Sequence, residues 1–381
     1  MAKCKLGDIC EIVSGSTPKT NIDEYWDGDI KWITPAELDD DTYIITDSVR
    51  KITELGVRKT GLSPIPEGTV ILSSRAPIGK VAIAGCEMYC NQGFKNLICS
   101  NKISNKYLYW FLKGKKALLN ALGRGATFKE ISKSIVSEIE INVPDLVCQN
   151  EVVKTLEKVN SIISLRKQEL HALDNLIKAR FVELFGDVQR EEKYKGILLR
   201  KLCTTVSGGT PSTKFQKYYE GNIPWISTVS LGPNHIDGSN AKGYITQEAI
   251  ENSATKLIPA GNILFGTRVG VGKSSLNDVD ICTNQDIVAI IGIDESRFNR
   301  LFVKHVLDSY QSYYDSIKKG ATILGITSDD LKETLIPDAP IEIQMNYVAF
   351  VDQIDKSKVK VQKSLDETQC LFDSLMQKYF G

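Results

Sequence analysis

The stretch that decides the fold is "VSGSTPKT" at residues 13–20, because nearly the same eight letters return as "VSGGTPST" at residues 206–213. Six of the eight letters are identical, and the two copies lie 193 residues apart. Glycine, proline and hydroxyl side chains in so short a span are typical of a turn held by side-chain-to-backbone hydrogen bonds. The same turn twice in one chain indicates an internal repeat.

The repeat extends far beyond this turn. "IPEGTVILSSRAPIGK" from Ile65 matches "IPAGNILFGTRVGVGK" from Ile258 at the same spacing of 193 residues. "GAT" at Gly125 returns at Gly320, and "LFG" at Leu184 returns as "YFG" at Tyr379, both at a spacing of 195. The chain is therefore a tandem duplication, and its 381 residues also exceed what a single core usually organises.

Composition and charge exclude several classes of protein. The chain is 42% hydrophobic and 25% charged, which is ordinary for a folded protein. Lys+Arg and Asp+Glu both total 47, so the chain lacks the basic excess expected of a bulk polyanion binder. Locally, residues 102–133 carry eight Lys or Arg against one acid, Glu130, which predicts either a phosphate-facing surface or the solvated face of a helix.

The nine cysteines predict no metal site and no disulfide framework. Cys86 and Cys90 are the only pair with close spacing, and the three histidines lie far from them, whereas zinc requires a compact set of four ligands. Scattered thiols are typical of a reducing compartment. The N-terminal residues show no apolar signal region, and no apolar run approaches the roughly 20 residues of a membrane helix. We therefore expect a cytoplasmic protein.

Each copy joins a mixed, β-rich part to a long helix. Short β-rich runs such as "VILSS" and "KVAIAG" alternate with Gly, Pro, Asn and Asp, and a proline in "INVPD" or "LIPDAP" marks the start of the helix. Apolar residues then recur at alternating steps of four and three, at eight of ten positions in each copy when Tyr347 and Tyr379 are counted in the second, which predicts a coiled-coil seam on helices about 50 Å long. The predicted seam consists of Val152, Leu156, Val159, Ile163, Leu170, Leu173, Ile177, Leu184, Val351, Ile354, Val361, Leu365, Phe372 and Leu375.

The predicted order is globule, long helix, globule, long helix. The expected segments are a globule at residues 1–147, a helix at 148–190, a second globule at 196–340 and a second helix at 341–381. The fold class is thus α+β, with two α/β globules and two long helices. We expect these helices to pair antiparallel about a pseudo-twofold axis, because a parallel pair would need a longer return connection. The alternative is that each helix packs on its own globule or on another chain.

The sequence shows no catalytic apparatus. "GTRVGVGKSS" from Gly266 resembles a phosphate-binding loop, but Gly266 is one residue too far from Gly272 and Lys273, and the other copy has Ser73 and Val81 at the corresponding ends. The three histidines have no equivalents in the other copy. A binding protein is favoured over an enzyme that acts by itself.

Small polar, amide and cationic residues recur at the turns of both copies. Hydroxyls and turn amides suit phosphate oxygens, while Arg, Asn and Gln suit base edges. Structural roles in the turns, and a core role for the tryptophans, remain open alternatives. The candidate DNA-contacting residues are Ser14, Thr17, Thr20, Trp32, Arg75, Lys80, Asn91, Gln92 and Lys95 in the first copy, and Ser207, Thr210, Thr213, Trp225, Arg268, Lys273, Asn284 and Gln285 in the second.

Over its whole length the chain resembles the specificity subunit of a type I restriction-modification system. The resemblance is carried by "VSGSTPKT…YWDGDIKWITPAEL", "IGKVAI", "NQGFKNL", "GATFKEIS", "PDLVCQNEVV" and "LDNLIKARFVELFGD". The second copy repeats them as "VSGGTPST…YYEGNIPWISTVSL", "NQDIVAI", "GATILGIT" and "LFDSLMQKYFG". The motifs are specific in combination.

The resemblance implies a function and a set of partners. Each globule would be a target recognition domain reading one half of a bipartite, asymmetric DNA site, and the helices would set the spacing and dock two methyltransferase subunits. Those subunits would bind S-adenosylmethionine, and motor-nuclease subunits would use ATP and Mg²⁺, so this non-catalytic chain would bind no cofactor or metal itself. The alternative is a two-lobed protein–protein scaffold without DNA readout.

Overall fold

The computed structural model describes residues 2–75, 77–125, 129–320 and 322–381. Both "GAT" motifs fall partly outside these residues, as does the alanine of "SSRAPIGK". The chain divides into two compact units, residues 1–168 with 361–381, and residues 169–360. Each unit contains one globule and part of each long helix.

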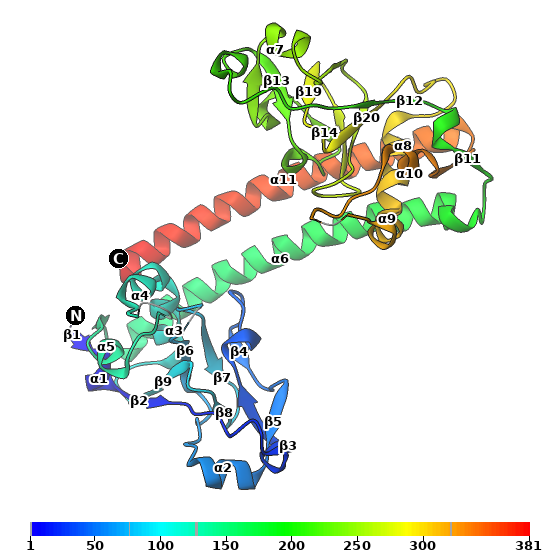
Figure 1. Cartoon of the computed structure of the whole chain (residues 1–381). Helices are drawn as coiled ribbons and strands as arrows, with labels where there is room; N and C mark the ends of the chain where they lie inside the picture. Colours follow the sequence, from blue (N-terminus) through cyan, green and yellow to red (C-terminus); the bar gives the residue numbers. More distant parts are fainter. Residues whose placement is uncertain (1, 76, 126–128, 321) are drawn as a thin grey trace. The chain divides into compact units, whose positions relative to one another are not determined.

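The first globule is built on three sheets. A five-stranded sheet has the order β2-β9-β6-β7-β4, a three-stranded sheet has the order β5-β3-β8, and β1 pairs with β10 (Figure 1). Its elements are β1 (Ala2–Lys5), α1 (Leu6–Ile9), β2 (Cys10–Ser14), η1 (Asp23–Tyr25), β3 (Trp26–Ile33), η2 (Pro35–Glu37), β4 (Ile44–Ile45), β5 (Arg50–Ile52), α2 (Glu54–Thr60), β6 (Val70–Ser73), β7 (Val81–Ala84), β8 (Tyr89–Cys90), β9 (Phe94–Cys99), α3 (Asn105–Gly114), α4 (Lys116–Leu122), α5 (Lys133–Ser137) and β10 (Glu140–Val143).

The second globule repeats this topology. Its five-stranded sheet has the order β12-β20-β17-β18-β14, its second sheet has the order β15-β13-β19-β16, and β11 pairs with β21. Its elements are η3 (Val188–Arg190), β11 (Gly196–Leu198), η4 (Leu199–Lys201), β12 (Thr204–Ser207), η5 (Gln216–Tyr219), β13 (Ile223–Ile226), η6 (Thr228–Ser230), β14 (His235–Ile236), η7 (Gly238–Asn240), β15 (Gly243–Ile245), α7 (Gln247–Glu251), β16 (Leu257–Ile258), β17 (Ile263–Gly266), β18 (Ser274–Asn277), β19 (Ile281–Thr283), β20 (Ile287–Ile291), α8 (Arg300–Ser309), α9 (Gln311–Ile317), α10 (Ser328–Lys332) and β21 (Leu335–Pro337).

Two helices of 40 residues follow the globules: α6 (Leu146–Phe185) and α11 (Ile341–Phe380). Each begins shortly after a proline, Pro144 or Pro340, as the fixed φ of proline favours. α6 ends at Gly186, whose φ of 71° is a left-handed conformation that glycine adopts without strain. The Gly186 amide donates to the Val182 carbonyl at 2.8 Å and closes the last turn.

The two long helices pair antiparallel within each unit. In the first unit, Leu156 near the start of α6 shares a core with Phe372 near the end of α11. In the second unit, Ile177 near the end of α6 shares a core with Val351 near the start of α11. All fourteen residues of the predicted seam are buried or half-buried. The expected α+β class, with two α/β globules and two long paired helices, is confirmed.

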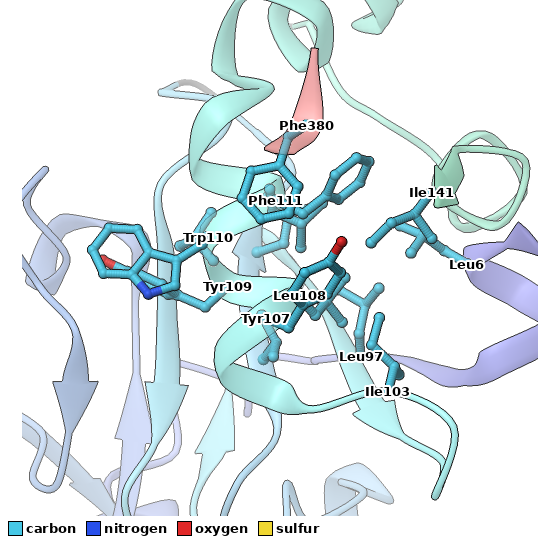
Figure 2. Close-up of a cluster of buried hydrophobic side chains, with 14 of the residues drawn as sticks. Leu6, Leu97, Ile103, Tyr107, Leu108, Tyr109, Trp110, Phe111, Ile141 and Phe380 are labelled. Atoms are coloured by element: carbon cyan, nitrogen blue, oxygen red, sulfur yellow. The ribbon is translucent and has the colours of Figure 1, made fainter. Parts of the chain in front are cut away.

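The core of the first unit lies between the five-stranded sheet and α3. Consecutive residues of α3 from Tyr107 to Leu112 are all buried, because sheet, α6 and α11 surround this helix. Figure 2 shows Tyr107, Phe111 and Phe380 gathered at the end of α11, with ring centroids 5.1 Å apart for Tyr107–Phe380. Edge-on contacts of this kind stabilise a core beyond the area they bury.

Candidate nucleic-acid interface

The repeated turn holds its shape because its glycine touches a neighbouring loop. A Cβ on Gly15 would lie 2.2 Å from the carbonyl oxygen of Asn91, and one on Gly208 would lie 2.1 Å from that of Asn284. No real side chain tolerates such contacts, so both copies require glycine there. The turn after β2 or β12 is thereby fixed against the Asn-Gln loop of the same globule.

The same two side chains then join turn and loop in both copies. The hydroxyl of Thr17 donates to the amide oxygen of Gln92, and the hydroxyl of Thr210 donates to that of Gln285. Both glutamines are exposed. The duplication has thus preserved a contact between residues 75 positions apart, at a place where hydroxyl and amide groups face solvent.

The tryptophan that recurs in both copies lies behind the turn. Trp32 and Trp225 are 2% and 8% exposed, and each donates its indole N–H to a turn carbonyl at 3.1 Å, on Ser16 and Gly209 respectively. The structure therefore gives both rings a place in the core that supports the turn. Direct contact of these rings with DNA stays a prediction.

In the first globule, the predicted residues Arg75 and Lys95 form one charged network with Glu130. Glu130 accepts from Arg75 Nε at 2.9 Å and from Lys95 Nζ at 3.0 Å. Lys95 lies opposite Ser14 in the β2–β9 ladder and is 6% exposed, whereas the Arg75 side chain is 44% exposed. A single carboxylate therefore holds one buried and one exposed cation beside the repeated turn.

This network keeps Glu130 ionised. Partial burial pushes the pKa of Glu130 upward, but the hydrogen bonds from Lys95 and Arg75 outweigh burial and hold the pKa below its usual value. The carboxylate is therefore charged at neutral pH, and the local charge of the three side chains is +1.

The second globule places the equivalent arginine differently. Arg268 faces Asp286 at 3.8 Å, and Val288 occupies the position of Lys95 opposite Ser207. A cavity of about 680 Å³ opens here. Its lining brings together the predicted residues Ser207, Arg268 and Gln285 with Lys319 and Thr322. Hydroxyl, amide and cationic groups around one hollow can donate to phosphate oxygens and base edges.

Other predicted residues have structural or solvent-facing positions. The Lys80 ammonium donates to backbone carbonyls of Pro35, at 3.3 Å, and of Leu38, so in this structure it holds the η2 turn. Asn91 Oδ1 accepts from the Gly93 amide, and Asn284 Nδ2 donates to Asp286, so both asparagines shape their own loop. The remaining predicted residues Thr20, Thr213 and Lys273 are exposed, as are several of those described above.

Four residues of the site were not predicted from the sequence: Glu130, Asp286, Lys319 and Thr322. Glu130 was visible as the single acid in a basic stretch, and that isolation was the available signal. Asp286, Lys319 and Thr322 carry no comparable signal.

Among the residues that the structure describes, no group of three His, Cys, Asp or Glu side chains is placed to hold a metal ion. None of the described helices combines the length and apolarity needed to cross a membrane.

Two copies of one α/β globule, each with a polar site beside the same turn, joined by paired long helices, define a duplicated two-headed binding protein. Comparison with known proteins narrows this class. The family model for the type I restriction modification DNA specificity domain matches residues 1–175 and again residues 191–368.

Curated relatives and solved structures agree with this match. The specificity subunit of type I restriction enzyme MjaIX from Methanocaldococcus jannaschii is 28% identical over 98% of this chain and 91% of its own. That of EcoR124I/EcoR124II from Escherichia coli is 30% identical over 67% of this chain and 64% of its own. In fold, the chain is similar to the S subunit from M. genitalium, with a TM-score of 0.56, 15% identity and coverage of 100% and 96%. The chain is also similar in fold to one from a structure that describes complex assembly and conformational transition of the type I R-M system. The TM-score is 0.63 at 19% identity, and the match covers 100% of this chain and 97% of the other.

The chain therefore belongs to the type I restriction modification DNA specificity family. It is a non-catalytic DNA specificity subunit, part of a type I restriction-modification complex that binds DNA.

Proposed function

We propose that each globule reads one half of a bipartite, asymmetric DNA site through the face that carries the repeated turn. The observation that supports this most is that the two globules share the same contacts around the turn but differ in the side chains beside it. The Thr–Gln contact, the Trp–carbonyl contact and the exposed arginine recur in both globules. Lys95 and Glu130 in one globule correspond to Val288 and Gly325 in the other. A common frame positions the protein on the phosphates, and different side chains select different bases.

The long helices set the distance between the two half-sites and dock two methyltransferase subunits. This proposal rests on the family and on the length of α6 and α11, since a stiff helix pair fixes half-site spacing as dimeric DNA-binding proteins do. S-adenosylmethionine belongs to the methyltransferase subunits, and ATP with Mg²⁺ to motor-nuclease subunits that join for cleavage. Such a complex acts on the genome, so the chain works in the cytoplasm.

The test is methylome sequencing of cells that express this chain with its methyltransferase subunit, compared with the same subunit alone. A bipartite methylated motif with a fixed gap, seen only when both proteins are present, is the expected result. If the two proteins are soluble and associated but no new methylation appears, the reading proposal is wrong and a scaffold without DNA readout is favoured.

A further inference from the structure

Two cysteines face each other across the β2–β9 ladder of the first globule. Cys10 begins β2 and Cys99 ends β9, and the antiparallel register places them directly opposite each other although they are 89 positions apart in the sequence. Directly opposite residues point to the same face of a sheet. Cys10 accordingly lies in the core of the first unit, 7% exposed, and Cys99 is half-buried at the border of that core. Both are free thiols in this structure.

This pair occupies a ladder position at which a disulfide can bridge two strands. The Ser100 amide donates to the Ile9 carbonyl at 3.0 Å, so Ile9 and Ser100 form a hydrogen-bonded pair. Hydrogen-bonded and non-hydrogen-bonded pairs alternate along an antiparallel ladder, which makes Cys10 and Cys99 a non-hydrogen-bonded pair. The Cα atoms of such a pair lie about 4.5 Å apart, inside the range of about 4.4–6.8 Å that a disulfide spans.

The two thiols differ in reactivity. The Cys10 thiol donates a hydrogen bond to the Cys99 sulfur, which lowers the pKa of Cys99, whereas burial opposes this effect. The same hydrogen bond, together with burial, raises the pKa of Cys10. Cys99 is also the more exposed of the two side chains. Because the thiolate is the nucleophile, Cys99 is the sulfur that reacts first with an oxidant in solution, and Cys10 lies beside it as the second thiol.

The second globule lacks this pair. Cys203 stands at the position of Cys10, but Gly292 takes the position of Cys99. Cys203 immediately precedes β12 and Gly292 immediately follows β20, the strands that correspond to β2 and β9. The same cross-link can therefore form in the first globule alone.

We propose that Cys10 and Cys99 form a redox-active dithiol, which hydrogen peroxide oxidises to a disulfide between β2 and β9. The Cys99 thiolate attacks one peroxide oxygen, the O–O bond breaks, and the released hydroxide takes up the Cys99 proton as the first water. The sulfenic acid left on Cys99 is then attacked by the Cys10 sulfur, the S–O bond breaks, and the hydroxide leaves with the Cys10 proton as the second water. Two thiols thereby lose two electrons to the peroxide, and a dithiol reductant reverses the change.

The cross-link holds the strand that leads into the repeated turn. β2 runs from Cys10 to Ser14, at the start of the turn, and β9 carries Lys95 opposite Ser14. In a reducing compartment such a disulfide is transient and forms in response to an oxidant. It closes a long loop of the unfolded chain, so the oxidised first globule should unfold at a higher temperature than the reduced one. The sulfur chemistry does not depend on whether the globule reads DNA.

Oxidation of the reduced full-length chain tests the dithiol. The chain is treated with a small molar excess of hydrogen peroxide, the remaining thiols are blocked with iodoacetamide, and peptides from a digest without reductant are identified by mass spectrometry. We expect the cross-linked peptides of Cys10 and Cys99 as the main product and a loss of two of the nine thiols. In calorimetry, an unfolding transition should move up by about 5 °C or more. Dithiothreitol should reverse both changes.

Three variants distinguish this reaction from general oxidation of thiols. Cys10→Ser and Cys99→Ser should each abolish the cross-link and the shift of the unfolding transition, so the test does not depend on the folding of a single variant. Cys203→Ser, the equivalent of Cys10→Ser in the second globule, should leave both unchanged. The dithiol would be overturned by oxidation of Cys99 to a sulfinic acid without a disulfide, or by linkage of either cysteine to Cys4 or another thiol as the main product. An equal shift in wild type and Cys10→Ser would also overturn it.

Discussion

At the scale of single residues, the equivalent arginines of the two globules, Arg75 and Arg268, are paired with acidic residues from different loops. Glu130 lies on the bridge Arg124↔Glu130, which corresponds to the bridge Lys319↔Gly325 in the second copy. Asp286 lies in the Asn-Gln loop, where the first copy has Gly93. The acid has therefore moved between two loops while the arginine has stayed.

Glu130→Gln should strengthen binding of the assembled complex to non-cognate DNA. The change frees the exposed Arg75 for a phosphate and removes a charge that repels DNA. We expect the plot of the logarithm of the binding constant against the logarithm of salt concentration to steepen by about one unit of slope. A fourfold drop in salt should therefore raise the affinity of the variant by roughly threefold more than that of wild type. Anisotropy at several salt concentrations measures it. Glu151→Gln, the same charge change at an exposed position on α6, is the control, and an equal effect there would contradict the role given to Glu130.

His305 should make the second unit sensitive to acid. Its two ring nitrogens contact the Tyr347 hydroxyl at 2.6 Å and Asn234 Oδ1 at 2.9 Å. Burial, reinforced by the charges of Lys304 and Lys358, holds the pKa of His305 well below its usual value. Below about pH 6.5 the unfolded chain therefore binds a proton that the folded chain does not. In that range, each unit by which the pH is lowered reduces the free energy of unfolding by about 1.4 kcal/mol.

Thermal unfolding at pH 7.5 and 5.5 measures this sensitivity. His305→Gln, which keeps hydrogen-bonding groups but does not titrate, should lose about 1 kcal/mol less than wild type on acidification. If both proteins lose the same stability, other titratable groups carry the acid response.

Gly15→Ala should disrupt the repeated turn. The new Cβ would meet two backbone carbonyl oxygens, of Asn91 at 2.2 Å and Cys90 at 2.3 Å, neither of which can move without shifting the loop. We expect a loss of about 1–3 kcal/mol in stability, seen as a lower melting temperature. Gly243→Ala is the control, because its Cβ would meet nothing within 4 Å, and comparable destabilisation there would show that the clash is not the cause.

At the scale of elements, the seam of the long helices is the feature most open to a stability test. Leu156 is fully buried in the core that α6 and α11 share with the first globule, whereas Leu165 on the same helix is 59% exposed. Leu156→Ala should cost about 2–5 kcal/mol, and Leu165→Ala should change stability by less than about 0.5 kcal/mol. Thermal melts of both variants compare them directly, and similar losses would contradict the assigned seam.

The elements that could be predicted from sequence are those whose signal is local. The heptad spacing from Val152 onward and the prolines before each helix anticipate α6 and α11, and the repeated turn anticipates two equal globules. The partners of the arginines could not be predicted in this way. Aligning the copies pairs Glu130 with Gly325, so the repeat itself conceals an acid that only tertiary packing brings to Arg75.

At the scale of the whole molecule, the two globules should act as independent readers. Replacing residues 1–147 with the first globule of another family member should change one half of the methylated motif and leave the other half and the gap as they were. The reason is that each proposed reading face is built entirely within one globule. Methylome sequencing of the chimera checks this, and a change in both halves would refute the two-reader model.

The exchange of acids between loops also has an evolutionary consequence. Consider recombination between the two copies inside a globule, with the crossover after the equivalent strands β9 and β20. One product would join Arg75 and Lys95 of the first copy to the Gly325 loop of the second copy, which provides no carboxylate for them. The reciprocal product would set Arg268 against two carboxylates. Breakpoints in α6 and α11 keep each arginine with its own acid, so these helices are also positions at which new specificities can be inherited without a change in local charge balance.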